Sequence, residues 1–167
     1  VLGFKPQMLA DAAPPLELLA GSETTVISVL AGVELASLAR HFPQAGGVVR
    51  LMPNLAAAIG KSPNALVATG LADERRIAVT DLAERLGSAE WLADEGQFEL
   101  VTALAGSGPG FVYRFIDSLA AAATRLGLEA DQAERLAVQM VEGAAALAST
   151  ADLSPAELAR KVASPGG

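Results

Sequence analysis

The first ninety residues alternate between short apolar runs and segments with the spacing of helices. A β-branched run at 24–30 and an apolar run at 48–52 are each typical of a buried strand. Residues 8–19 and 33–40 have apolar positions at helical spacing. Because strands and helices alternate, we predict right-handed crossovers and a parallel sheet.

Three further short segments extend this predicted sheet. Residues 1–4 resemble the end of a buried strand that a proline stops, and 65–70 and 88–93 read as two later strands. A helix is predicted between those two, at 73–86. The sequence therefore predicts an α/β domain over residues 1–93.

From residue 94 onward, helical periodicity replaces the β-branched runs, so we place a domain boundary between 93 and 94. Helices are predicted at 95–104, at 109–126, from Asp131 and from Ser154 onward, the last two beginning with a capping box. The second and third helices each carry an apolar stripe. These stripes are Phe111, Phe115, Leu119, Ala122 and Leu126, and Ala133, Leu136, Ala137, Met140, Ala144 and Leu147.

A glycine-rich stretch lies between the first two predicted helices of this second domain. Gly106 and Gly108 alternate with small residues, and Pro109 suits the first position of a helix. We predict a tight turn with Ser107 as the N-cap residue. Such a turn could bind an anion such as a carboxylate, or it could simply let neighbouring backbones pass closely.

Composition narrows the range of functions. The net charge is −7 without a Lys/Arg cluster, so nucleic acid is excluded as a partner. The absence of cysteine excludes disulfides, thiol catalysis and cysteine-bound metal, and a single histidine argues against other metal sites. No apolar run reaches the ~20 residues of a membrane span. The abundance of Ala and Gly favours closely packed helices or an oligomer interface.

Individual polar residues give weak signals. Gly60-Lys61-Ser62 is rejected as a phosphate loop, because Leu55 stands where that motif needs glycine. Lys5 and Asn54 follow predicted strands, where α/β sheets bind ligands, but a solvated side chain is the simpler interpretation of each. Glu95 and Glu99 lie one helical turn apart. No catalytic triad, carboxylate pair or metal cluster can be assembled.

Several motifs together resemble the pyrroline-5-carboxylate reductase family, in its order and spacing. The motifs are Gly3–Gln7, Ile27–Val33, Val49–Asn54, Val101–Leu104 with Gly106–Pro109, and Val162–Gly167. The resemblance implies a partial Rossmann-type nucleotide-binding domain over 1–93 and an all-α dimerisation and substrate-binding domain over 94–167. It also implies a first βαβ unit before Val1, with the glycine-rich phosphate turn, and helices after Gly167. On this basis we expect the isolated piece to be inactive.

The activity implied by the resemblance is reduction of 1-pyrroline-5-carboxylate to proline, with a hydride transferred from the reduced form of NADP or of NAD. A cytoplasmic homodimer or larger homo-oligomer is implied, without a metal or a dedicated catalytic acid–base residue. The implied cofactor-binding residues are Gly3, Phe4, Lys5, Pro6, Val29, Leu30, Ala31 and Asn54. The implied substrate-binding residues are Glu95 near the ring nitrogen, and Ser164, Pro165, Gly166 and Gly167 around the carboxylate.

This resemblance changes the interpretation of the glycine-rich stretch. Within the family pattern, residues 106–109 start the dimerisation helix, and anion binding moves to the turn at 164–167. The chain departs from the family at Leu55 and Ala56, where Thr-Pro is common, and at Ala163, where Thr is common. Two alternatives therefore stay open: a divergent paralogue that reduces another cyclic imine, and a non-catalytic helical dimerisation module.

Overall fold

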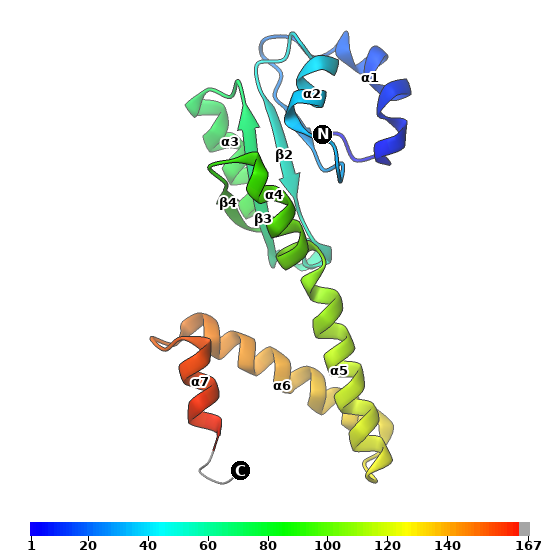
Figure 1. Ribbon diagram of the computed structural model, residues 1–167, viewed down its shortest axis with the longest axis vertical. Helices are drawn as coiled ribbons and strands as arrows, with labels where there is room; N and C mark the ends of the chain where they lie inside the picture. Colours follow the sequence, from blue (N-terminus) through cyan, green and yellow to red (C-terminus); the bar gives the residue numbers. More distant parts are fainter. Residues whose placement is uncertain (164–167) are drawn as a thin grey trace. The chain divides into compact units, whose positions relative to one another are not determined.

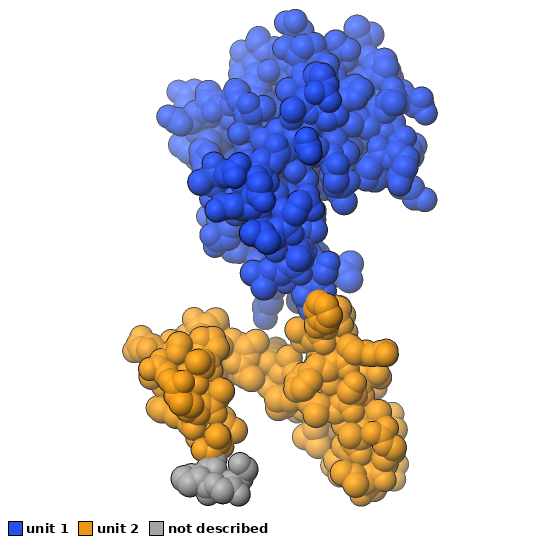
Figure 2. Space-filling view, viewed as in Figure 1, with its two compact units in different colours: residues 1–108 blue, residues 109–167 orange. Residues whose placement is uncertain are grey.

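The computed structural model describes residues 1–163 (Figure 1). The chain forms two compact units, Val1–Gly108 and Pro109–Gly167, which are drawn in different colours in Figure 2. Among the described residues, no helix is long and apolar enough to cross a membrane.

The first unit is built on a four-stranded mixed sheet. Its strands are β1 (Val26–Ser28), β2 (Val48–Met52), β3 (Ser62–Thr69) and β4 (Gly87–Trp91), in the order β1-β2-β3-β4. β1 and β2 are parallel, as are β3 and β4, and Leu2 adds an isolated parallel bridge to Ser28 of β1. Each segment predicted as a strand therefore takes part in this sheet.

The predicted parallel arrangement is confirmed for Leu2, β1 and β2. No direction was predicted for β3, and β2 and β3 are antiparallel. Only residues 53–61 connect these strands, and they form a short 3₁₀ helix, η2 (Leu55–Ile59). A parallel crossover needs a dozen or more residues, so this connection can only reverse the chain. The reversal divides the sheet into two parallel pairs of opposite direction.

Helices cover both faces of the sheet. They are η1 (Pro6–Met8), α1 (Leu9–Glu17), α2 (Leu35–His41), α3 (Asp73–Glu84), η3 (Glu95–Gln97), α4 (Phe98–Val101) and the π-helical η4 (Thr102–Gly106). One core cluster joins Leu9, Leu38 and Phe98 from α1, α2 and α4 to Val48 and Val67 of the sheet. A second cluster joins α3 to the alternate strand positions. Burial on both faces explains the continuous apolar runs of the strands.

The start of the predicted helical domain belongs to the core of the first unit. Phe98 is 1% exposed, and the contacts of residues 94–108 place them in the unit that ends at Gly108. The predicted boundary between 93 and 94 therefore does not coincide with the division into compact units, and as a domain boundary it stays a prediction.

The glycine-rich stretch is helical. Positive φ angles occur at six glycines of the described chain, and Gly106 and Gly108 are not among them. Ser107 has φ −91° and ψ −26°, and its N–H donates to the carbonyl of Thr102 at 3.0 Å, across the π turn η4. The predicted tight turn is therefore wrong, whereas Ser107 does directly precede the next helix, with helical backbone angles. The π turn absorbs one extra residue, so the N–H of Ser107 is already paired and unavailable to an anion.

Up to residue 163, the second unit contains the helices α5 (Gly108–Arg125), α6 (Ala130–Thr150) and α7 (Pro155–Val162). The capping box at the start of α7 is confirmed, because Ser154 and Glu157 exchange hydrogen bonds. The predicted cap of α6 is wrong: the helix begins at Ala130 with Glu129 as N-cap residue, and Asp131 lies in the first turn.

Most of the predicted apolar stripe is exposed in a single chain. Phe111, Phe115 and Leu126 of α5 are 76%, 53% and 89% exposed. On α6, Ala133 and Ala137 are buried, whereas Met140 is 46% exposed. Phe111, Phe115 and Met140 help to line an apolar groove between α5 and α6. One copy of this unit therefore leaves a large apolar surface open to solvent.

Candidate functional site

The candidate ligand-binding site lies at the edge of the sheet where Leu2, β1 and β2 end. These three segments run parallel, so the residues that follow them emerge at the same edge. Ligands of open α/β sheets bind at such carboxyl ends. The structure thus brings together the three groups of predicted cofactor-binding residues: 3–6, 29–31 and Asn54.

Residues 3–6 and 29–31 would offer a ligand mainly backbone groups and one cationic side chain. Lys5 is exposed and directly precedes η1, with Pro6 as the first residue of that helix. Val29 is half-buried and Ala31 is exposed, whereas the side chain of Leu30 is 3% exposed and belongs to the core. A ligand at this edge would therefore contact Leu30 only through its backbone. The ammonium of Lys5 suits the phosphates of a dinucleotide.

Asn54 joins the end of β2 to the π turn. Its side-chain oxygen accepts from the N–H of Ala56 at 2.8 Å and so caps η2. Its Nδ2 donates to the carbonyl of Ala105 at 2.9 Å, and its backbone N–H donates to Ser62 Oγ at 2.9 Å. Three segments of the chain therefore meet at this residue, and its amide holds one fixed orientation.

Glu95 lies at a second junction, which it forms with β2 and α2. Its Oε1 accepts from Arg50 Nη1 at 2.7 Å and from the backbone N–H of Leu35 at 2.8 Å. Leu35 is the first residue of α2, so Glu95 caps this helix from a position 60 residues away. A carboxylate at a helix N-terminus is also favoured by the helix dipole.

Arg50 is a buried cation on the central strand β2. It is 3% exposed, its guanidinium lies 4.0 Å from the centre of the Phe98 ring, and Nη2 reaches Glu99 at 3.5 Å. Within residues 1–163 its Nε has no hydrogen-bond partner. Because a buried charge is costly unless it is paired, Glu95 is the group that allows Arg50 to occupy this place.

Sequence reasoning missed Arg50. The signal was present, since one arginine interrupts the apolar run Val48–Met52 and a buried strand accepts a cation only beside a partner. The spacing of Glu95 and Glu99 was noticed, but nothing in the sequence joined these carboxylates to β2.

The predicted carboxylate-binding turn, Ser164, Pro165, Gly166 and Gly167, lies outside the described residues. Helix α7 ends at Val162, with Ala163 as its C-cap residue. Among residues 1–163, no group of three or more His, Cys, Asp or Glu side chains could hold a metal ion.

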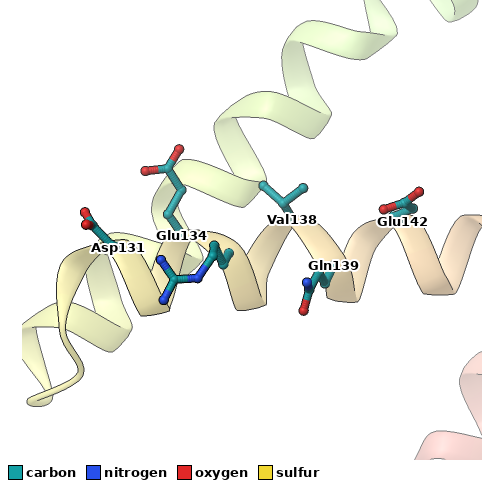
Figure 3. A pocket seen from close by; sticks show the side chains of 6 residues that line it. Asp131, Glu134, Val138, Gln139 and Glu142 are labelled. Carbon is teal, nitrogen blue, oxygen red and sulfur yellow. The ribbon is translucent and has the colours of Figure 1, made fainter. Parts of the chain in front are cut away.

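A polar hollow on α6 is another surface feature with several polar side chains. All the residues that line it belong to this single helix. In Figure 3, the side chains of Asp131, Glu134, Val138 and Glu142 lie on one side of α6, and that of Gln139 lies on the opposite side. Side chains from one helix do not converge on a common point, so this surface has no arrangement suited to catalysis.

Comparisons with known proteins agree with this architecture. The family model for pyrroline-5-carboxylate reductase dimerisation matches residues 95–167. A pyrroline-5-carboxylate reductase 2 of Bacillus subtilis is 36% identical over 170 residues, which cover 100% of this chain and 60% of the relative. A pyrroline-5-carboxylate reductase from Pseudomonas aeruginosa is 35% identical, over 100% of this chain and 62% of the relative.

Solved structures give the same result. A pyrroline-5-carboxylate reductase from Coxiella burnetii matches with a TM-score of 0.90 and 31% identity, over 99% of this chain and 62% of that one. A Plasmodium falciparum pyrroline carboxylate reductase solved with NADP bound matches in fold, with a TM-score of 0.86 and 23% identity, over 99% and 66%.

The fold and the exposed stripe define a class of protein: a Rossmann-type α/β nucleotide-binding domain followed by an all-α dimerisation domain. More narrowly, the chain is similar over its whole length to pyrroline-5-carboxylate reductases, and its second part matches the dimerisation domain of that family. It spans about 60% of the length of the Bacillus and Pseudomonas relatives.

Proposed function

We propose that the protein to which this chain belongs reduces 1-pyrroline-5-carboxylate to proline, with NADPH or NADH as the hydride donor. The supporting observation is that the similarity to pyrroline-5-carboxylate reductases extends over the entire chain, at 36% and 35% identity. At the edge formed by residues 3–6, 29–31 and Asn54, the exposed Lys5 is a cation that would contact a phosphate of the dinucleotide.

The bound nicotinamide would supply a hydride to the carbon of the C=N bond, while the ring nitrogen carries the proton. A protonated imine is already a good electrophile, so the protein mainly has to align two rings and hold a carboxylate. Residues 3–6 and 29–31 would hold the cofactor, with Asn54 beside the nicotinamide. Residues 164–167 would receive the substrate carboxylate through backbone N–H groups. This chemistry requires no dedicated acid–base side chain.

The direct test uses the intact protein, purified in its native oligomeric state. We expect oxidation of NADPH or NADH that depends on added pyrroline-5-carboxylate and yields proline. The fall in absorbance at the band of the reduced nicotinamide measures this oxidation. Comparison of the two cofactors also decides which one is preferred. A folded oligomer without turnover under either cofactor would refute the enzymatic proposal and favour a non-catalytic dimerisation module.

A divergent substrate is the second candidate. Leu55 follows Asn54 directly and is 78% exposed, where the family commonly has a threonine. An apolar side chain beside the proposed nicotinamide position favours a less polar cyclic imine. A panel of five- and six-membered cyclic imines, with and without a carboxylate, separates this candidate from the first by the ratio of kcat/KM values.

We also propose that the protein forms a homodimer or a larger homo-oligomer in the cytoplasm, through the apolar stripe of α5 and α6. The exposed Phe111, Phe115 and Met140 support this, since a second copy would cover them. Phe115→Glu should weaken self-association about thirtyfold or more, because a central aromatic anchor is replaced by a charge. Gln139→Glu, on the polar surface of α6, is the matched control. Sedimentation velocity across a dilution series gives the measurement; an unchanged oligomer of Phe115→Glu would contradict the assignment.

A further inference from the structure

The resemblance implies that Glu95 lies near the ring nitrogen of the substrate, but in the structure its carboxylate is paired with Arg50, to which the resemblance assigns no role. Both groups lie on the face of the sheet that α2 and α4 cover, and Arg50 is almost fully buried there. The Oε1 atom of Glu95 already accepts two hydrogen bonds, one from Arg50 and one from Leu35. An exposed ion pair contributes little, but this pair is tied to the backbone of a third element.

The two bonds of Glu95 lead to the two loops that form the candidate cofactor edge. Leu35 begins the helix that follows residues 29–33, so its N–H fixes where that loop ends. Arg50 lies on β2, four residues before Asn54. Its guanidinium therefore holds in place the strand at whose end Asn54 lies, at the same edge. A single carboxylate thus connects the loop after β1 with the strand whose end carries Asn54.

We propose that Glu95 and Arg50 are positioning residues that hold these two loops in the geometry that binds the dinucleotide, and that Glu95 does not contact the substrate. This inference rests on the proposed function of the edge. Without the pair, the loops would spend only part of the time in the binding geometry. The apparent affinity for the dinucleotide would then fall in proportion to that fraction.

The experiment compares Glu95→Gln, Arg50→Met and the double variant in the intact protein. Glu95→Gln removes the charge that neutralises Arg50. We expect the fold to survive, because Gln keeps the shape and the oxygen that accepts from Leu35 and Arg50, and Glu99 remains 3.5 Å from the guanidinium. The dissociation constant of the reduced dinucleotide, measured by titration without imine, should rise about tenfold, as for one lost charge-assisted hydrogen bond. Arg50→Met should have a similar effect, and the double variant should bind no worse than the weaker single one.

Glu23→Gln is the matched control, because Glu23 forms an ion pair with Arg75 at 3.1 Å while being 92% exposed. Its dinucleotide affinity should equal that of the unmodified protein. Hydrogen exchange gives a readout that does not depend on activity. In Glu95→Ala the amide of Leu35 should exchange faster, whereas that of Leu38, bonded to the carbonyl of Glu34, should keep its protection in a folded protein.

Each alternative has its own result. If Glu95→Gln raises only the KM for the imine and leaves the dinucleotide affinity unchanged, Glu95 contacts the substrate and the positioning role is refuted. Additive effects of the two single substitutions would also refute it, because coupled partners are not additive. If the unmodified protein binds dinucleotide but reduces no cyclic imine, the proposed reaction is refuted. The positioning role is then still decided by the dinucleotide titrations of the Glu95 and Arg50 variants.

Discussion

The contact between Asn54 and Ala105 gives the sharpest prediction about the candidate site. Asn54→Asp keeps the oxygen that caps η2 through Ala56 but replaces the NH₂ donor by a second acceptor. That acceptor would face the carbonyl of Ala105 in the π turn. The substitution therefore changes one hydrogen bond and almost no volume.

The magnitude follows from the two parts of this change. Loss of one neutral hydrogen bond costs about 1 kcal/mol. Leaving the partly buried carbonyl of Ala105 unpaired, opposite a carboxylate, adds about 1–2 kcal/mol. The free energy of unfolding of the first unit should thus fall by about 2–3 kcal/mol, which is about a 30- to 150-fold change in the folding equilibrium.

Urea denaturation measures this change, and hydrogen exchange locates it. The amide of Ser107 bonds across the π turn to Thr102, so it should exchange faster in Asn54→Asp than in the unmodified protein. Asn54→Ser is the comparison variant: its hydroxyl can still cap η2, and it loses the bond to Ala105 without introducing a charge. We expect its stability to lie between those of the other two proteins. If Asn54→Asp matched the unmodified protein in both measurements, the contact would have no energetic role.

Two further predictions concern backbone geometry and pH. Gly87 has φ +150°, and a Cβ there would collide with the backbone of Ser62. Gly87→Ala should therefore separate β4 from β3 and lower the thermal midpoint of unfolding by several degrees. Gly21→Ala is the control and should leave the midpoint unchanged, because Gly21 has open space around it. Hydrogen bonds from the side chain and backbone of Ser154 lower the pKa of Glu157 below its usual value. Their contribution to α7 is therefore complete above the unfolded-state pKa and is lost as pH falls through the lowered folded-state pKa. NMR amide shifts of α7 should show fraying in that acidic range. Ser154→Ala should weaken this pH dependence, because it removes the side-chain bond and keeps the backbone N–H.

The sequence predicted the elements better than it predicted their connections. The runs at 24–30 and 48–52 became β1 and β2 because both faces of the sheet are covered, and apolar runs of that kind have no other stable place. No direction was predicted for β3, and in the structure the few residues between Met52 and Ser62 leave no room for a crossover.

The candidate site was predicted unevenly for a physical reason. Lys5 and Asn54 were noticed because they follow predicted strands, whereas the other residues of 3–6 and 29–31 were assigned to the cofactor only through the family resemblance. The ion pair of Arg50 and Glu95 joins residues that are 45 positions apart, and the contact of Asn54 with Ala105 joins residues 51 apart. Such contacts depend on tertiary packing, which no local pattern encodes. The π turn is equally invisible, because glycine and serine suit a turn and a distorted helix alike.

The docking of residues 94–108 onto the sheet has a consequence for the order of folding. Leu2, β1, β2 and the helices between them are synthesised well before Phe98, which completes their core. Until Glu95 is synthesised, Arg50 lacks its partner carboxylate and α2 lacks its cap. The proposed positioning role then implies that the loops at the candidate edge are not yet fixed. Closing loops of this length is slow and entropically costly. A nascent chain should therefore acquire its dinucleotide affinity late, only once the π turn has left the ribosome, even though most of the sheet is already present.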